Sequence, residues 1–366
     1  MSSKSPRSGA GSPTARRRLS VVTGKGKGKG NIFADQDKID GFGDERKSMV
    51  DGKKITEKNN IQKTNDGVIE RYCSFSRVGY VPFNNSKVNQ DRYLEQMKFA
   101  NEDSKHLFGV FDGHGVNGHD VSQFLIDILP NAIAGKKNLD SEPEAAITKA
   151  FIEVNEKLDR SGIDVTCSGT TAVVCYIKGT SILTCNSGDS RAVIGQLEEG
   201  KLIALPLSID QKPELESERK RIVKSGGRVQ ACQDLDGRPI GPMRVWLKHQ
   251  DIPGLAMTRS FGDKLAASVG VTCEPEILKF DIELGKTQFI VLGSDGIWEF
   301  ISNSEAVDMV AEAATPQEAV SELVNEATRR WQAEEEVIDD ITATVVYLKE
   351  SKYPINYVKK NKSGKK

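Results

Sequence analysis

The segment Phe111-Asp112-Gly113-His114-Gly115 follows a short apolar strand that the sequence predicts over residues 106–111. Three other segments also place aspartate beside glycine or beside an apolar run, and they are Ser187-Gly188-Asp189-Ser190-Arg191, Leu292-Gly293-Ser294-Asp295-Gly296 and Asp339-Asp340-Ile341-Thr342. One Asp-Gly pair is only a turn signal. Several at strand ends, spread over more than two hundred residues, predict loops that converge on one metal centre. Carboxylates are the hard oxygen ligands that Mg²⁺ and Mn²⁺ take together with waters.

Single residues in this set have ordinary structural explanations. An aspartate at a strand end forms a turn more often than it binds a metal, and a lone loop histidine is more often structural than catalytic. The combination of these residues in one chain favours a metal site over these structural explanations. Gly113 lets its own carbonyl approach an ion closely, His114 follows directly where an imidazole can deliver a proton, and Asp91 precedes another short apolar segment.

The chain has 366 residues, of which 37% are hydrophobic and 28% charged, an ordinary globular composition. The net charge is −1, but the charges are segregated. Residues 1–30 carry eight Lys or Arg, residues 351–366 carry six Lys, and neither segment contains an acid. The remaining chain therefore has a net charge of −15, which suits cation binding, whereas basic ends suit loose contact with anionic surfaces.

These patterns predict three regions. Residues 1–65 lack the large apolar side chains that repay chain entropy, and we expect a disordered basic tail there. A catalytic domain is expected at residues 66–350, followed by a basic C-terminal tail at 351–366. We expect no specific nucleic-acid binding, since residues 1–30 contain no aromatic residue. A nucleic-acid-binding protein that works through its tails is the alternative.

The cysteine pattern favours a reducing compartment. None of the six cysteines forms a Cys-x-x-Cys pair, so a zinc cluster is not expected. No signal peptide is visible, and the longest apolar runs are too short to cross a bilayer. We therefore expect a cytoplasmic or nuclear protein without a transmembrane segment. Nothing in the sequence indicates a dimer seam, and a monomer is expected.

Strands are predicted at residues 72–76, 106–111, 170–177, 181–186, 192–196, 202–205, 288–292 and 341–348. Amphipathic helices are predicted at 120–133 and 145–158. Ser302 and Thr315, each followed three residues later by glutamate, predict capping boxes that open two more helices. Strands in runs and helices in pairs are typical of an α+β fold rather than a doubly wound parallel sheet.

A charged helix is expected to open at Pro213, to run to Lys224 and to be stopped by Gly226-Gly227. We interpret most of its charged side chains, which include Glu216, Glu218 and Arg221, as a solvated face. Residues 228–260 contain three prolines and are expected to be irregular.

Eight segments, in order, resemble the motifs of the metal-dependent serine/threonine protein phosphatases of type 2C. They are Lys87-Val88-Asn89-Gln90-Asp91, Phe108-Gly109-Val110-Phe111-Asp112-Gly113-His114-Gly115, Ser168-Gly169-Thr170-Thr171-Ala172, Asn186-Ser187-Gly188-Asp189-Ser190-Arg191-Ala192, Asp210-Gln211-Lys212-Pro213, Leu255-Ala256-Met257-Thr258-Arg259-Ser260-Phe261-Gly262-Asp263, Ser294-Asp295-Gly296-Ile297-Trp298-Glu299 and Asp339-Asp340-Ile341-Thr342. The resemblance covers residues 68–350, about three quarters of the chain.

The resemblance implies a four-layer α-β-β-α sandwich, in which helices flank two antiparallel β-sheets and a metal cleft lies at one end. It implies two tightly bound Mg²⁺ or Mn²⁺ ions, with Asp112 bridging them and Gly113 contributing its backbone carbonyl. Asp295 and Asp339 are implied as the other direct ligands, and Asp91 as the residue that holds metal-bound waters. Asp189, together with Asp295, is implied to bind a third, weaker ion.

The implied reaction is hydrolysis of phosphoserine and phosphothreonine in proteins by a metal-bridged hydroxide, without a phosphoenzyme. His114 is implied as the proton donor to the leaving alkoxide, a contribution of roughly 10²–10⁴-fold. Phosphorylated proteins are the expected partners. Many members have an arginine near the first acidic motif for the substrate phosphate, and Lys87 is expected to replace it as a point charge. The alternative is a pseudophosphatase that binds partners without catalysis, although Asp112, Asp295 and Asp339 are all present.

Overall fold

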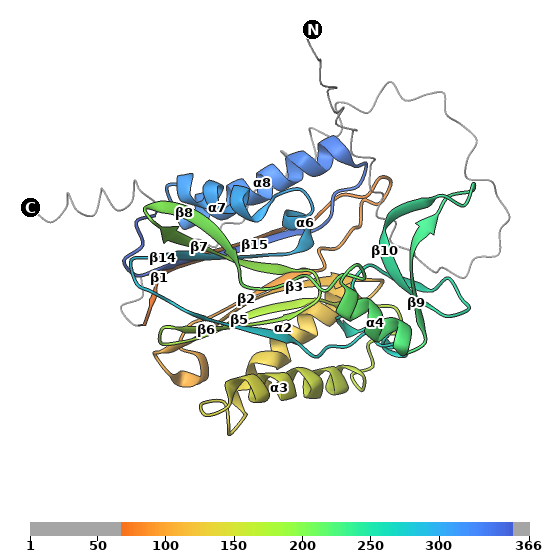
Figure 1. Ribbon diagram of the computed structural model, residues 1–366, viewed down its shortest axis with the longest axis horizontal. Coiled ribbons are helices and arrows are strands. Elements are labelled where there is room, and N and C mark those ends of the chain that lie inside the picture. The colour runs from red at the N-terminus through yellow and green to blue at the C-terminus, as the bar shows by residue number, and fades with distance from the viewer. Residues whose placement is uncertain (1–66, 354–366) are drawn as a thin grey trace, which may run out of the picture.

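The computed structural model describes residues 67–353. Two β-sheets pack face to face, and each carries a pair of helices on its outer side (Figure 1). This is the predicted α+β fold, a four-layer α-β-β-α sandwich. The predicted N-terminal tail and all but the first three residues of the predicted C-terminal tail lie outside the described residues. Among the described residues, no helix is long and apolar enough to cross a membrane.

The first sheet has five strands, in the order β1 (Ile69–Arg77), β15 (Ile341–Leu348), β14 (Thr287–Gly293), β7 (Arg191–Glu198) and β8 (Lys201–Pro206). All neighbours are antiparallel. Helices α7 (Asn303–Glu312) and α8 (Pro316–Glu334) cover its outer face, as Figure 1 shows. Every side chain of β15 is buried because both faces of that strand are covered. Val345 packs with the helices and Val346 packs between the sheets, as the pleat of a strand requires.

The second sheet has seven strands. The main path is β12 (Phe261–Gly262), β4 (Gly169–Thr170), β3 (Lys105–His114), β5 (Ala172–Lys178), β6 (Ser181–Ser187) and β13 (Glu276–Asp281), and β2 (Asp91–Gln96) pairs with β3. The short 3-10 helix η1 (Phe99–Asn101) lies between β2 and β3.

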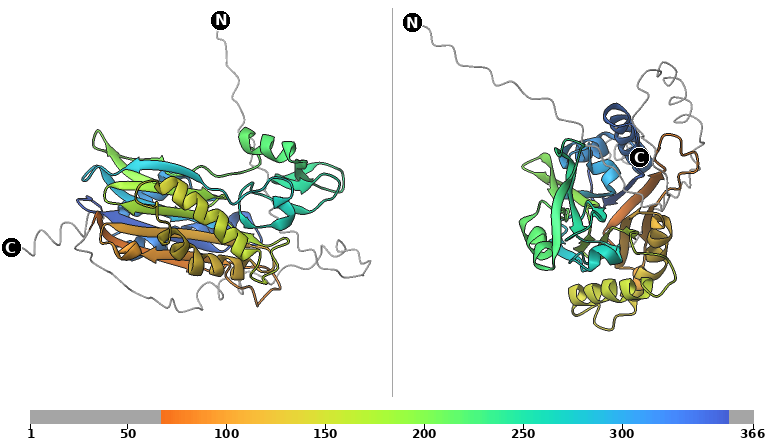
Figure 2. Two further views of the ribbon diagram at one scale, coloured as in Figure 1. Left: turned by 90° about the horizontal axis from the view of Figure 1, so that it is seen from below. Right: turned by 90° about the vertical axis from the view of Figure 1, so that its right-hand side faces the viewer.

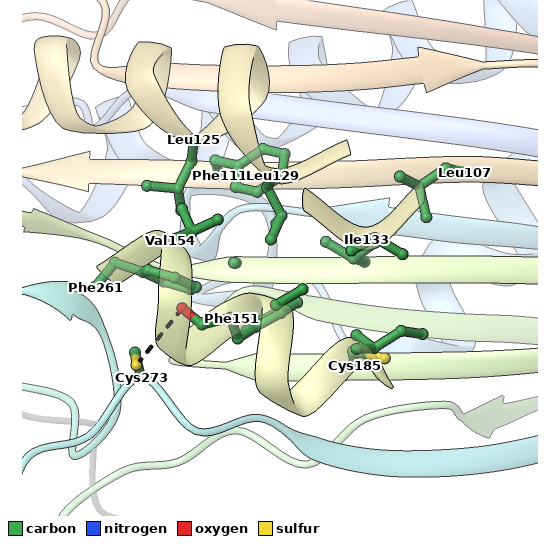
Figure 3. Close-up of a cluster of buried hydrophobic side chains, with 14 of the residues drawn as sticks. Leu107, Phe111, Leu125, Leu129, Ile133, Phe151, Val154, Cys185, Phe261 and Cys273 are labelled. Atoms are coloured by element: carbon green, nitrogen blue, oxygen red, sulfur yellow. Dashed lines mark hydrogen bonds between the residues drawn. The ribbon is translucent and has the colours of Figure 1, made fainter. Parts of the chain in front are cut away.

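Helices α2 (Gly118–Ala134) and α3 (Pro143–Leu158) lie on the outer face of this second sheet (Figure 2). Leu125 and Leu129 from α2 and Phe151 and Val154 from α3 meet Phe111 of β3 in one buried cluster (Figure 3). All of these side chains are fully buried. The predicted helices at 120–133 and 145–158 are therefore confirmed, each with slightly wider bounds.

The two predicted helix caps differ in detail. The Ser302 hydroxyl accepts a hydrogen bond from the amide of Glu305, and the Glu305 carboxylate accepts one from the amide of Ser302, which completes the predicted capping box of α7. The Thr315 hydroxyl caps α8 in the same way. The Glu318 carboxylate, however, accepts from the amide of Ala314 rather than that of Thr315.

Two predictions about residues 213–260 are wrong. The charged helix α4 spans Glu216–Lys224 and does not open at Pro213, which lies in a preceding turn. The segment expected to be irregular forms an antiparallel sheet of β9 (Gly227–Gln233), β10 (Pro239–Leu247) and β11 (Pro253–Leu255). This small sheet lies at one end of the sandwich (Figure 1). The short helices α5 (Lys264–Ala267) and α6 (Asp295–Trp298) complete the described elements.

Candidate metal centre

The predicted metal-binding aspartates come together at one end of the sandwich because strands of both main sheets begin or end there. Asp91 opens β2 and pairs directly with Asp112 of β3. Asp295 follows the end of β14 by two residues, and Asp339 precedes the start of β15 by two residues. Asp189 lies in the connection between β6 and β7. Strand topology alone therefore gathers residues that are far apart in sequence.

The backbone around Asp112 is held from two sides. The Asp112 amide donates to the Thr171 hydroxyl at 3.0 Å, and the Thr171 amide donates to the Asp112 carbonyl at 2.9 Å. At Gly113 an added Cβ would lie 2.3 Å from the carbonyl oxygen of Gly118 and 2.7 Å from that of Gln90. Only glycine fits this close approach of three backbone segments.

The electrostatics of the cluster are those of crowded like charges. Burial raises the pKa of Asp112, and the carboxylates of Asp295, Asp91, Asp339 and Asp189 raise it further. Burial and the nearby Asp340 carboxylate likewise raise the pKa of Asp91. Buried carboxylates that repel one another oppose ionisation until an opposite charge joins them.

The Asp91 carboxylate is 2% exposed and divides its two oxygens between different roles. Its Oδ2 accepts a hydrogen bond from the Ser294 hydroxyl at 2.7 Å. Its Oδ1 is buried and has no hydrogen-bond partner in the part of the chain that the structure describes. A buried acceptor without a partner is costly, so this oxygen is suited to an ion or to the water around one.

The donor set fits a hard divalent cation. Within residues 67–353, no three His, Cys, Asp or Glu side chains already surround a single point closely enough to hold an ion by themselves. Mg²⁺ does not need such a cage, because it usually binds through one or two carboxylates and keeps several waters. Aspartates near enough to raise one another's pKa meet that requirement, and a cation would remove their mutual repulsion.

His114 is held by a residue to which sequence reasoning assigned no role. Its Nε2 lies 2.6 Å from Oδ2 of Asp263, which is 1% exposed and also accepts from the Ser260 hydroxyl at 2.6 Å. Burial alone lowers the pKa of His114, but the Asp263 carboxylate outweighs it and the pKa is raised. Asp263 ends the matched segment beginning at Leu255, and its separation of 149 positions from His114 concealed the pairing.

Lys87 lies at the same end and is engaged by a carboxylate. The Lys87 Nζ is 2.5 Å from Oδ1 of Asp340. The same Oδ1 accepts a hydrogen bond from the Gly79 amide at 2.7 Å, and Oδ2 of Asp340 accepts one from the Gln90 amide at 2.9 Å. Asp340, 3% exposed, thus clamps both ends of the segment between β1 and β2. The role of Lys87 in binding substrate phosphate stays a prediction. Asp340, like Asp263, positions a residue of the site, and neither of these positioning roles was predicted from the sequence.

The interpretation of the α4 charges as a solvated face holds for Glu216, which is 79% exposed, but is wrong for Glu218. Glu218 is 3% exposed and accepts hydrogen bonds from Arg221, Thr258 and Arg259. The burial of the glutamate alone raises its pKa, but these partners reverse the effect and lower the pKa to about 2. This network fastens α4 to the segment before β12.

A sandwich of this architecture, with carboxylates gathered where the strands of both sheets end, can be compared with known protein families. The model of the family described as protein phosphatase 2C matches residues 83–335. The chain belongs to this protein phosphatase 2C family, which indicates protein phosphatase activity.

Two named relatives illustrate the likeness. The probable protein phosphatase 2C 64 of Oryza sativa subsp. japonica is 40% identical over 272 residues, which cover 71% of this chain and 62% of the rice protein. The probable protein phosphatase 2C 35 of Arabidopsis thaliana is 35% identical over 292 residues, 76% of this chain and 84% of that protein. The matching region thus spans less than two thirds of the rice relative.

Solved structures share the fold at low identity. The serine-threonine phosphatase 2C from Toxoplasma gondii has a TM-score of 0.68 and 19% identity, and the match covers 79% of this chain and 98% of that one. A sex determining protein of C. elegans has a TM-score of 0.60 and 21% identity, with 77% and 65% covered. Both confirm the predicted sandwich.

Proposed function

We propose that this chain hydrolyses phosphoserine and phosphothreonine in protein substrates at a centre that binds two Mg²⁺ or Mn²⁺ ions and a third more weakly. The observation that carries the proposal is the gathering of aspartates at the strand ends, where Asp91 pairs with Asp112 across two strands and Asp295, Asp339 and Asp189 lie close enough to raise the pKa of Asp112. Folding brings several negative charges together at one end of the sandwich, and bound divalent cations would neutralise them.

In this proposal Asp112, Asp295 and Asp339 bind the ions directly, together with the carbonyl of Gly113. Asp91 accepts hydrogen bonds from water through Oδ1, since Ser294 occupies its Oδ2. Asp189 joins Asp295 at the weaker third position. When bound, the ions neutralise a phosphate dianion and lower the pKa of water toward neutrality, so that water can attack phosphorus.

The chain itself supplies the remaining groups. His114 gives a proton to the leaving seryl or threonyl oxygen, and Asp263 fixes the orientation of the imidazole through Nε2. Lys87 adds positive charge for the substrate phosphate when it leaves Asp340. No side chain acts as nucleophile, and no phosphoenzyme forms. We further propose that the protein works as a monomer in the cytoplasm or nucleus.

The test is hydrolysis of an aryl phosphate and of a phosphothreonine peptide in the presence of Mn²⁺. Chelation and Asp112→Ala should each reduce turnover by at least about 10³-fold, since a lost metal removes the activated water. Asp308→Ala, on the exposed face of α7, is the matched control and should retain activity. Turnover that survives chelation would refute the metal mechanism. Wild-type chain that binds Mn²⁺ but hydrolyses neither substrate would support the pseudophosphatase alternative.

The absence of a phosphoenzyme needs a separate experiment. Acid quenching during turnover of a ³²P-labelled phosphoprotein should leave no label on the chain. Label that stays covalently attached through denaturation would show that a side chain acts as nucleophile.

A further inference from the structure

Three exposed apolar side chains lie on two adjoining loops at the end of the sandwich that holds the candidate centre. Phe83 is 92% exposed and Val88 is 53% exposed, and both lie between β1 and β2. Val116 is 73% exposed and lies just after β3, two residues beyond His114. We call Phe83, Val88 and Val116 the apolar rim. Single exposed apolar residues need no explanation, but these three lie beside a site that must receive another polypeptide.

The two loops are joined to each other and to the metal centre. The side-chain amide of Gln90 donates to the Gly115 carbonyl at 2.8 Å, which places the loop that carries Val88 against the loop that carries Val116. Asp340 binds the amides of Gly79 and Gln90 and so holds both ends of the Phe83 loop next to Asp339. Figure 1 shows this orange connection at the same end of the sandwich as the β9–β10–β11 sheet.

The conformation of Phe83 is itself unusual. Its φ is +63°, in the left-handed region that a bulky side chain rarely adopts. The loop maintains it with a turn in which the Asn84 amide donates to the Val81 carbonyl at 3.1 Å, and the Asn84 side chain accepts from the amide and hydroxyl of Ser86. Backbone strain of this kind persists where the surroundings fix it, and it is concentrated at functional sites.

We propose that the apolar rim receives an apolar side chain next to the phosphorylated residue of the protein substrate. This inference rests on the proposed function. Phe83 is four residues from Lys87 and therefore within about 14 Å of it. In this proposal a phosphothreonine that reaches the centre carries its neighbouring residues across the rim. The rim would bury an apolar neighbour and leave a polar neighbour without compensation for its lost hydration.

The experiment compares two phosphothreonine peptides of equal length, one with leucine and one with serine on each side of the phosphothreonine, with an aryl phosphate as reference. Phe83→Ala should lower the ratio of kcat/KM for the leucine peptide to that for the aryl phosphate by about tenfold, which corresponds to about 1.4 kcal/mol. The same ratio for the serine peptide should change less than about twofold, and Phe83→Leu should restore most of the loss.

The matched control is Leu284→Ala. Leu284 is 43% exposed and precedes the opposite end of β14, about 20 Å from the strand end that leads to Asp295. This variant should leave both peptide ratios unchanged.

The outcomes separate the two proposals. If the wild-type chain hydrolyses none of the three substrates with Mn²⁺, the proposed function fails and this inference falls with it. If the chain is active but Phe83→Ala leaves the leucine-peptide ratio unchanged, only the inference is overturned. It is also overturned if Phe83→Ala converts a dimer to a monomer in solution without changing peptide preference, since the rim would then join two copies of the chain.

Discussion

Replacement of Glu218 by glutamine tests whether a buried carboxylate fastens α4 to the rest of the fold. Glu218 accepts two hydrogen bonds from Arg221, at 2.5 and 2.7 Å, one from Thr258 at 2.6 Å and two from Arg259, at 2.9 and 3.3 Å. An amide can accept at only one atom and carries no charge. The substitution therefore leaves two half-buried guanidinium groups without their counter-charge, a situation that is strongly destabilising.

The magnitude follows from the pKa of this carboxyl group. Its partners lower the pKa from 4.5 to about 2. One pKa unit corresponds to about 1.36 kcal/mol, so the carboxylate contributes about 3 kcal/mol to the free energy of unfolding at pH 7. Because the folded state lowers the pKa, this contribution is complete above pH 4.5 and is lost as the pH falls through about 2. At pH 3 it should have fallen to about 1.4 kcal/mol.

Urea unfolding of the wild type and of Glu218→Gln, at pH 7 and again at pH 3, measures this difference. The control is Glu216→Gln on the same helix, whose carboxylate pairs with Lys220 at 2.6 Å in an exposed position. Exposed pairs of this spacing contribute less than about 0.5 kcal/mol. A loss below about 0.5 kcal/mol for Glu218→Gln at pH 7, or a loss that does not decrease at pH 3, would refute the reasoning.

Three further predictions concern the site and the core. His114→Ala should slow a phosphothreonine peptide more than an aryl phosphate, whose leaving group needs less protonation; equal slowing of both kcat values would count against the general-acid role. Phe151→Ala, in the cluster of Figure 3, should lower the free energy of unfolding by about 3–5 kcal/mol in urea, whereas Ile152→Ala at a 39% exposed position should cost much less. Mg²⁺ at a hundred times its Kd should raise the free energy of unfolding of the wild type, followed by calorimetry, by about 2.7 kcal/mol. An equal stabilisation of Asp295→Asn by the same Mg²⁺ concentration would contradict the assignment of Asp295 as a ligand.

The sequence predicted the sandwich well where a strand is buried on both faces or a helix shows a single apolar stripe. β15 reads Ile341-Thr342-Ala343-Thr344-Val345-Val346-Tyr347-Leu348, a run that needs no tertiary information to be recognised as a strand. Ser302 and Glu305 lie one turn apart, so their capping box is a local property of the chain.

The small sheet was missed because its prolines were counted without regard to position. Pro239 and Pro253 are the first residues of β10 and β11, where a missing amide costs little. Pro242 lies where the pairing of β10 with β9 shifts register between Ile240 and Met243, and a bulge there removes the need for its amide. Strand ends and bulges are set by the partner strand, which no single stretch of sequence reveals.

The positioning residues of the site were missed for a related reason. The pairs His114–Asp263 and Lys87–Asp340 join residues 149 and 253 positions apart. Resemblance located the aspartates because they belong to recognisable segments, but a hydrogen bond across the sandwich has no local signature. Glu218 shows the same limit, since the residues next to it in sequence, Ser217 and Arg219, are exposed and its partners Thr258 and Arg259 lie about forty residues away.

The candidate centre is also where the chain departs from the rules that stabilise the rest of the fold. Asp91 and Asp112 lie opposite each other in a strand pair, an arrangement of like charges that opposes folding. Most buried charges elsewhere in the described chain are matched, as Glu218 is by two arginines. A cluster whose members raise one another's pKa is therefore not explained by stability, and the apolar layers on both sides of the sheets must offset its cost. An ion that binds only the folded arrangement would recover part of that cost, which links the stability of this end of the sandwich to the same cations that the proposed reaction requires.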